Sequence, residues 1–137
     1  MGYMIGIDVG TSGVKTIVIN KQGDIMAEAT AKYPLYHPKA GWAEQDPEDW
    51  WQATLASLQE VSHALGGQVA RVKSIGLSGQ MHGSVFLDKT GQVLRPAILW
   101  CDVRTASQCR YIHEQVGRKE LIYYTSNPAL EGFTAPK

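Results

Sequence analysis

The sequence predicts an α/β domain that opens with three antiparallel strands and continues through crossover helices and further strands. Three segments rich in branched and small apolar residues, at 3–9, 14–20 and 25–32, are separated by glycine-containing turns of four residues each. Strands joined this tightly pair antiparallel, as a meander. A helical pattern and another apolar strand pattern follow, which is why we predict a mixed α/β fold.

The first helix is predicted to begin at Asp46-Pro47. Aspartate accepts hydrogen bonds from the first free N–H groups of a helix, and proline at the first helical position loses no hydrogen bond. Gly66-Gly67 is predicted to end this helix. Helical spacing predicts that its buried stripe consists of Trp51, Leu55, Leu58 and Leu65.

The second half of the chain is predicted to add strands and helices in turn. Strands are expected at 72–78, with Ile75 and Leu77 on one face, and at 84–88 and 97–100, which the turn at 89–92 would join. A helix from near Arg104 to Val116 and a short helix at 120–124 follow. The apolar face of the longer helix is predicted from Ala106, Cys109, Ile112 and Val116. This order matches the opening of a ribonuclease-H-like domain, although many α/β domains begin similarly.

Composition restricts the class of protein. The chain has 137 residues, 44% hydrophobic and 19% charged, which suits one globular domain. Thirteen basic and 13 acidic residues give no net charge and no basic block, so we expect no nucleic-acid partner. No apolar run approaches the roughly 18 residues that span a bilayer, and the start lacks a signal-peptide pattern. We therefore expect a cytoplasmic protein with no membrane partner.

The strongest chemical motif is the segment DVGTSGVK at residues 8–15. Glycines at 10 and 13 permit a tight turn and can adopt positive φ, so that successive N–H groups point at a phosphate oxygen. Thr11 and Ser12 add hydroxyl donors, and Lys15 could add positive charge, although strand alternation could point it elsewhere. The Gly-Lys-Ser/Thr ending of a P-loop is absent.

Asp8 is the candidate metal residue of this turn. At the end of a strand its carboxylate could hold hydrated Mg²⁺, which prefers oxygen ligands and keeps most of its waters. The alternative is an ordinary hairpin turn that Asp8 merely satisfies. A carboxylate on a buried strand is costly unless it is paired or bound to metal, and this favours the functional interpretation.

Several further motifs, taken with the turn, resemble the FGGY carbohydrate kinases and, among them, the xylulokinases. The turn resembles the first phosphate motif of the superfamily of sugar kinases, heat-shock 70 proteins and actin, and GWAEQDP at 41–47 resembles the segment that follows it in FGGY kinases. The narrower matches are SGQMHG at 78–83, RPAILW at 95–100, NPAL at 127–130 and GFTAPK at 132–137. The resemblance covers the whole chain.

The resemblance implies roles for individual residues. It assigns Asp8 to the metal and phosphates, Gly10, Thr11, Ser12, Gly13 and Lys15 to ATP, and Met81 and His82 to the sugar. Histidine can hydrogen-bond a sugar hydroxyl, and methionine offers a pliable apolar wall. The alternative is that Met81 is a core residue and His82 a turn residue. Trp100 and Asp102 could border the sugar cleft, although Asp102 could equally cap a helix.

The resemblance further implies an actin-like ATPase fold, with residues 1–137 as an incomplete N-terminal sugar-kinase domain. In the family the catalytic base and the domain that holds the adenosine of ATP come later in the chain. We therefore expect the parent enzyme to phosphorylate D-xylulose with ATP and Mg²⁺, and the 137 residues alone to be inactive. Gluconate, ribulose or glycerol is the alternative substrate, a non-catalytic folded fragment is a second interpretation, and a homodimer stays open.

Overall fold

A computed structural model describes residues 2–137, which form two compact units. The first unit contains the residues up to Pro34 together with Glu48–Gln80. The second contains Leu35–Pro47 together with Met81–Lys137. The phosphate-turn motif therefore lies in the first unit. Met81 and His82 lie in the second unit, at the start of its longer segment.

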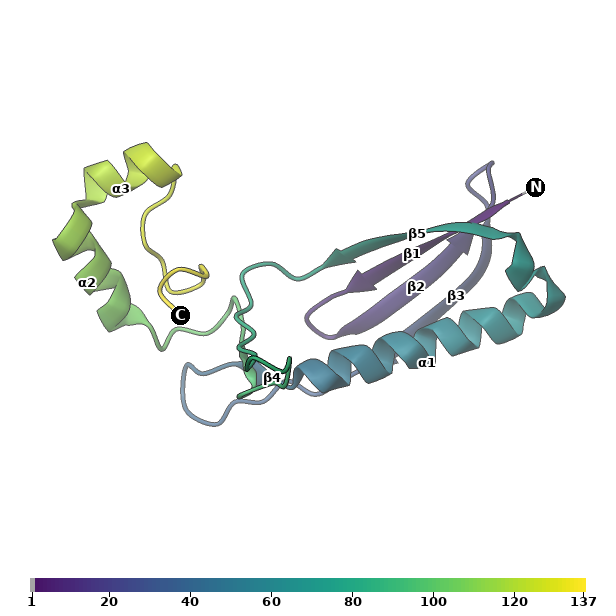
Figure 1. The fold of residues 1–137 in the computed structure, drawn as a ribbon, viewed down its shortest axis with the longest axis horizontal. Coiled ribbons are helices and arrows are strands. Elements are labelled where there is room, and N and C mark those ends of the chain that lie inside the picture. The colour runs from purple at the N-terminus through teal and green to yellow at the C-terminus, as the bar shows by residue number, and fades with distance from the viewer. Residues whose placement is uncertain (1) are drawn as a thin grey trace. The chain divides into compact units, whose positions relative to one another are not determined.

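The first unit is built on a sheet of four strands in the order β3-β2-β1-β5 (Figure 1). The strands β1 (Tyr3–Val9), β2 (Gly13–Ile19) and β3 (Ile25–Lys32) form the predicted antiparallel meander. The strand β5 (Val72–Gly79) pairs with β1 in parallel, with Ile5 opposite Ile75. The predicted bounds of these four strands are correct to within one residue.

The helix α1 (Pro47–Leu65) makes the crossover from β3 to β5, and it begins at the predicted residue. It ends at Leu65, directly before Gly66-Gly67 as predicted, and a 3₁₀ segment, η1 (Gly66–Arg71), follows. The predicted buried stripe is confirmed at Leu65 and in part at Leu58, which is partly buried and packs against the core. Trp51 is 56% exposed, and the fully buried face consists of Ala53, Ser57, Val61 and Leu65. Small residues one turn apart allow the helix to pack closely on the sheet, and this decides which face is buried.

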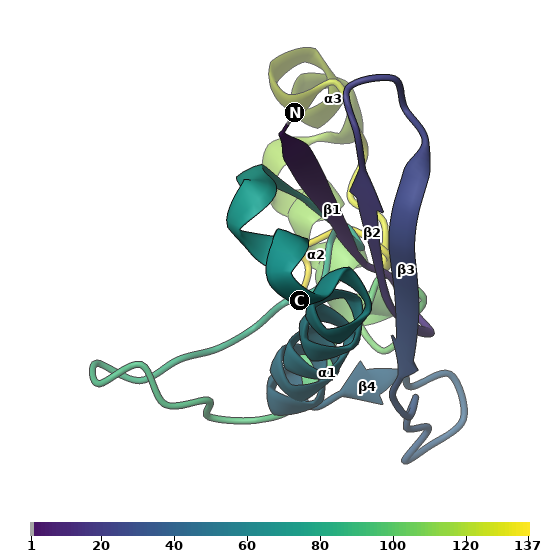
Figure 2. The same ribbon diagram turned by 90° about the vertical axis from the view of Figure 1, so that its right-hand side faces the viewer.

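The core of the first unit lies between α1 and one face of the sheet (Figure 2). Strand alternation directs Tyr3, Ile5 and Ile7 toward the helix, and directs Asp8 to the opposite face. One polar pair is buried in this core, since the hydroxyl oxygens of Thr16 and Ser57 lie 2.7 Å apart in a hydrogen bond. The other core residues are Val14, Val18, Ala29, Tyr33, Ala53, Val61 and Leu65.

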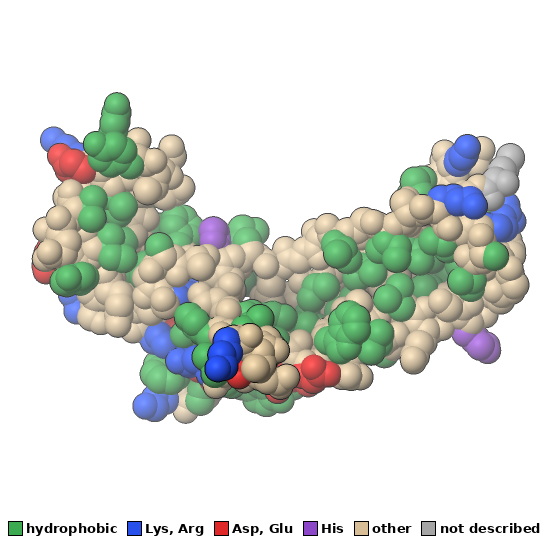
Figure 3. All heavy atoms as spheres, in the orientation of Figure 1, with side chains coloured by type: hydrophobic (Ala, Val, Ile, Leu, Met, Phe, Trp, Pro, Cys, Tyr) green, Lys and Arg blue, Asp and Glu red, His purple; other side chains and the backbone are tan. Residues whose placement is uncertain are grey.

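The edge strand β5 exposes large apolar side chains. Ile75 is 58% exposed and Leu77 is 78% exposed, and both share the register of β1 residues that are buried. Figure 3 shows hydrophobic side chains at the surface over this sheet. Ile75 and Leu77 do share a face of the sheet, as predicted, but at this edge the face is exposed and the two residues are not part of the core.

The second unit has little regular structure. Its strand β4 (Glu44–Gln45) pairs antiparallel with β6 (Ala97–Ile98). The longer strands predicted at 84–88 and 97–100 are reduced to β6 and to isolated bridges between Ser84 and Ile98 and between Leu87 and Val93. Among residues 2–137, no helix combines the length and the apolar character that crossing a membrane requires.

Two helices complete the second unit, α2 (Ala106–Val116) and α3 (Arg118–Thr125). The short helix predicted at 120–124 lies within α3. The helix α2 begins two residues later than predicted, after Thr105, and of its predicted apolar face only Cys109 is buried. Burial is the main cause that raises the pKa of the Cys109 thiol, and Cys101 and Cys109 are both free cysteines.

Candidate functional site

Asp8 lies near the carboxyl end of β1, on the sheet face opposite α1. Its side chain is exposed and borders a surface pocket of about 500 Å³, together with Lys15, Ile17, Gly76 and Ser78. Asp8 is therefore not the buried carboxylate that was predicted to need a metal or a partner, because the outward-facing side of this strand is open. An exposed carboxylate beside a pocket is instead accessible to a cation from solution.

The turn after β1 is closed by a backbone hydrogen bond, in which the Gly10 N–H donates to the Gly13 carbonyl oxygen at 3.1 Å. Neither glycine has positive φ, so that expectation is wrong. Gly13 is needed for a different reason. A Cβ atom at this position would lie 2.5 Å from the carbonyl oxygen of Ala31, so any side chain here would separate β2 from β3.

Two residues outside the 8–15 motif hold this turn. The buried Tyr33 donates its hydroxyl hydrogen to the Gly10 carbonyl oxygen. The Thr11 hydroxyl donates to the amide oxygen of Gln80 at 3.3 Å, and the Gln80 N–H donates to the Val9 carbonyl oxygen at 2.9 Å. Burial, and then the nearby charge of Asp8, raise the pKa of Tyr33, which keeps its hydroxyl a donor. No spacing signal in the sequence points to Tyr33.

Lys15 and Ser12 take different positions around the turn. Ser12 is exposed at its tip. Lys15 is the direct cross-strand partner of Asp8, and its ammonium nitrogen lies 3.0 Å from a carboxylate oxygen of Glu28. Both side chains of this ion pair are 55% exposed, and such pairs typically contribute about 0–1 kcal/mol. A phosphate could therefore compete with Glu28 for Lys15 at little cost.

The donor set suits magnesium better than a metal that needs several protein ligands. Within residues 2–137, no group of three or more His, Cys, Asp or Glu side chains is placed to hold a metal ion. Mg²⁺ commonly keeps several waters and uses one or two carboxylates together with phosphate oxygens. The single exposed carboxylate of Asp8 beside the turn fits that pattern.

In the second unit, the structure distinguishes between the two interpretations of Met81. This side chain is 68% exposed, so it is not a core residue. Its neighbour His82 is partly buried and borders a pocket of about 320 Å³ in the second unit. His82 has a left-handed backbone, with φ of 60°, and its ring centroid lies 4.8 Å from that of Phe133.

Asp102 does not cap α2, since Thr105 occupies the N-cap position, and it does not line an open cleft, since its side chain is fully buried. It accepts hydrogen bonds from the Ala43 N–H at 2.7 Å and from the Arg104 guanidinium at 2.6 Å. The same guanidinium donates to Glu44 at 2.7 Å, and Arg95 donates to Glu44 at 2.9 Å. Burial alone would raise the pKa of Asp102, but the hydrogen bonds from Arg104 and Ala43 lower it overall.

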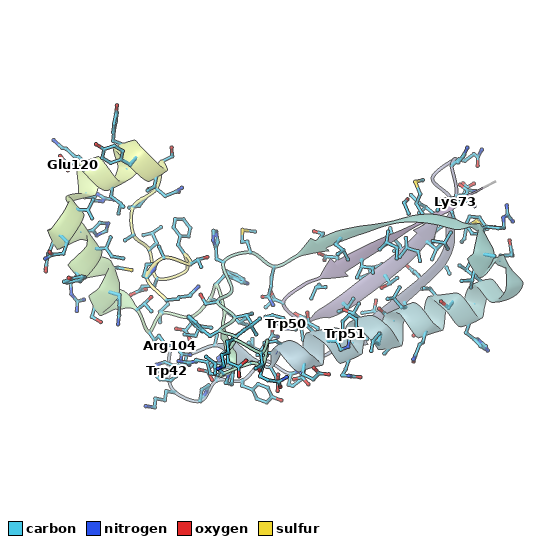
Figure 4. The ribbon with its side chains drawn as sticks, viewed as in Figure 1. Trp42, Trp50, Trp51, Lys73, Arg104 and Glu120 are labelled. Carbon is cyan, nitrogen blue, oxygen red and sulfur yellow. The ribbon has the colours of Figure 1, made fainter. Side chains whose placement is uncertain are left out.

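Arg104 also fixes an aromatic side chain. Its guanidinium carbon lies 3.6 Å from the centroid of the Trp42 ring, and Figure 4 shows the two side chains together. Such cation–π contacts are strongest when the cation is desolvated, and the Arg104 side chain is only 10% exposed. Trp100, which lies two positions before Asp102 in the chain, is 47% exposed. The cluster is therefore a structural element that supports the segment carrying Trp100.

Comparisons with known proteins match this chain to carbohydrate kinases along nearly its whole length. Residues 3–137 match the model of the FGGY family of carbohydrate kinases, N-terminal domain. A xylulose kinase of Bacillus subtilis is 50% identical over 137 residues, covering 100% of this chain and 27% of its own length. A glycerol kinase of Aquifex aeolicus is 40% identical over 115 residues, which are 83% of this chain and 23% of that protein.

A solved structure confirms the fold prediction. The crystal structure of a xylulose kinase from Brucella ovis superposes with a TM-score of 0.91 at 35% identity, covering 98% of this chain and 28% of that one. The fold is thus that of the sugar kinases with an actin-like ATPase architecture. This chain spans about a quarter of the length of the relatives it matches.

The buried ion cluster generates a prediction about acid stability. The native pKa of Asp102 is lowered, so its stabilising effect is fully present above the unfolded value of 3.8 and is lost as the pH falls below that value. We expect Asp102→Asn to lower the free energy of unfolding by about 3 kcal/mol at pH 7, since it breaks a buried pair. The loss should be smaller at pH 3.

Urea unfolding of the chain at pH 7 and pH 3 measures both effects. Glu114→Gln, which removes an exposed carboxylate on α2, is the matched control and should change little at either pH. Equal unfolding curves for the two variants at pH 7 would show that Asp102 does not stabilise the second unit.

Proposed function

Because the chain belongs to the FGGY family of carbohydrate kinases, we propose that it forms part of an enzyme that transfers the γ-phosphoryl group of ATP to D-xylulose. The product is D-xylulose 5-phosphate. The observation that carries this proposal is the 50% identity to a named xylulose kinase along all 137 residues. The remaining three quarters of such an enzyme would supply the catalytic base and the adenosine site.

The first unit would contribute the phosphate side of the reaction. Sugar kinases of this family use ATP, usually with magnesium, and bound Mg²⁺ neutralises charge on the transferred phosphate. Asp8 would hold this ion through water from the open face of the sheet. The turn from Gly10 to Gly13 would position the phosphates, with Thr11 fixed by Gln80 and Ser12 exposed at the tip. The Lys15 ammonium would leave its ion pair with Glu28 and bind a phosphate oxygen instead.

The second unit would contribute the sugar side. The His82 ring can donate or accept a hydrogen bond, which suits a sugar hydroxyl. Met81 is exposed beside it in the sequence and offers an adaptable apolar surface. Support for these roles comes from the exposure of Met81 and from the fixed left-handed backbone of His82. The 40% identity to a named glycerol kinase makes glycerol the alternative acceptor.

A full-length form tests the proposal directly. This chain would be joined to the C-terminal portion of the Bacillus subtilis relative, in place of the matched segment. We expect this chimera to consume ATP with D-xylulose at a kcat/KM well above its value with D-ribulose, glycerol or gluconate. A folded chimera that binds ATP but prefers glycerol would overturn the choice of substrate.

Asp8→Asn in the chimera should lower kcat by about 10–100-fold, the range typical of outer-sphere metal partners, with little change in KM for the sugar. Asparagine keeps the shape of the side chain but removes the charge that attracts Mg²⁺. Raising the Mg²⁺ concentration should restore part of the activity in steady-state assays. Glu60→Gln, on the exposed side of α1, is the control. Lost thermal stability with unchanged specific activity would indicate a structural role only.

His82→Ala should lower kcat/KM for D-xylulose by about 10–100-fold and leave KM for ATP nearly unchanged. A lost hydrogen bond that leaves a buried partner unsatisfied costs about 1–3 kcal/mol, and 1.36 kcal/mol is tenfold. The ratio of kcat/KM for D-xylulose to kcat/KM for D-ribulose should decrease as well. Kinetics at saturating ATP measure this, with the exposed His63→Ala as the control. A change confined to ATP affinity would place His82 on the nucleotide side.

A further inference from the structure

His82 has a backbone conformation that needs support. Its φ of 60° lies in the left-handed region, which residues other than glycine adopt uncommonly. Within the described residues, only Ser126 shares this feature among the non-glycine positions. Such conformations persist where the surrounding structure fixes them, and they gather at ligand sites. The contacts that hold His82 in this conformation therefore bear on any role of its side chain.

Two contacts from one short segment hold His82 on both its backbone and its ring. The Lys137 ammonium donates to the His82 carbonyl oxygen at 3.0 Å and to the Gly132 carbonyl oxygen at 2.8 Å. The Phe133 ring packs against the imidazole at 4.8 Å between centroids, with 38° between the two planes. One side chain thus fixes the direction of the peptide, and the other fixes the plane of the ring.

The segment that supplies these contacts is itself folded back by local hydrogen bonds. The Phe133 N–H donates to the Leu130 carbonyl oxygen at 2.9 Å, and the Lys137 N–H donates to the Thr134 carbonyl oxygen at 3.1 Å. Gly132 lies close against the Trp100 backbone, since a Cβ atom there would be 2.7 Å from the Trp100 carbonyl oxygen. The segment is therefore anchored on the turn at Trp100 before it reaches His82.

A lysine is well suited to this position. An ammonium group has three donors, so it can bond two carbonyl oxygens at once and still carry its charge. Burial is the largest influence on Lys137 and lowers its pKa, while the charges of Asp102 and Cys101 oppose that change. A partly buried cation that donates to two backbone carbonyls acts on the positions of those carbonyls.

We propose that Lys137, together with Phe133, is a positioning residue that presents the His82 imidazole to the sugar. This inference rests on the proposed function, in which His82 contacts a sugar hydroxyl. It adds that sugar recognition depends on two residues that need not touch the sugar themselves. Lys137 acts through the His82 carbonyl, and Phe133 acts through the His82 ring.

A double-mutant cycle in the chimera tests this proposal. The variants are His82→Ala, Lys137→Met, both together, and Lys137→Arg, with the exposed Lys119→Met on α3 as the control. We expect Lys137→Met to lower kcat/KM for D-xylulose about tenfold while KM for ATP stays unchanged. In the His82→Ala background the same substitution should have little further effect, because the residue through which it acts is gone. Lys137→Arg keeps a charged donor and should recover part of the activity.

The outcomes separate this inference from the proposed function. If His82→Ala itself leaves sugar use unchanged, the proposed sugar contact is wrong and the inference falls with it. If His82→Ala lowers kcat/KM but Lys137→Met does not, or lowers it equally in both backgrounds, the inference alone is overturned. Circular dichroism checks folding. Should Lys137→Met fail to fold, Phe133→Leu replaces it in the same cycle, with the same outcomes deciding.

Discussion

The parallel pairing of β1 with β5 is the constraint on which the first unit depends. Parallel neighbours cannot be joined by a tight turn, so the chain must cross over, and α1 makes that crossing while covering one face of the sheet. The carboxyl ends of both strands then lie at the same edge, with Val9 opposite Gly79. This places Gln80 beside the turn that follows β1, where its amide holds Thr11. Thr11 and Gln80, which lie 69 positions apart in the sequence, thus become neighbours in space.

The elements that were predicted well are those whose signals are local. Apolar segments bounded by tight glycine-containing turns predicted the meander, and Asp46-Pro47 predicted the start of α1. The buried face of α1 was missed because it depends on how closely the helix approaches the sheet, and small Ala53 and Ser57 allow that approach. The longer strands predicted in the second unit were wrong for a similar reason. Without a wide sheet to join, apolar segments there form only two-residue pairings.

In the candidate site, too, local sequence signals predicted some residues, and contacts between distant parts of the chain were not predicted. Asp8, the turn and the Met81-His82 element were found from motifs, whereas the side chains that hold them were not. Tyr33 reaches Gly10 from 23 positions away, and Lys137 reaches His82 from 55 positions away. For Asp102 two interpretations were open, a residue that borders the sugar cleft and a helix cap, and its buried position agrees with neither. Asp102 bonds Ala43, and Arg104 also bonds Glu44 at the start of β4. Both partners come from a segment far earlier in the chain, and only folding brings these charges together.

The exposed edge of β5 has a consequence for how this polypeptide behaves in solution. A strand with one neighbour offers a row of backbone donors and acceptors to any other strand, and Ile75 and Leu77 add apolar surface beside it. Lys73 gives this edge one charge, which does little to repel a second molecule. These 137 residues should therefore associate increasingly as their concentration rises, and the association should begin at β5 rather than at the helices.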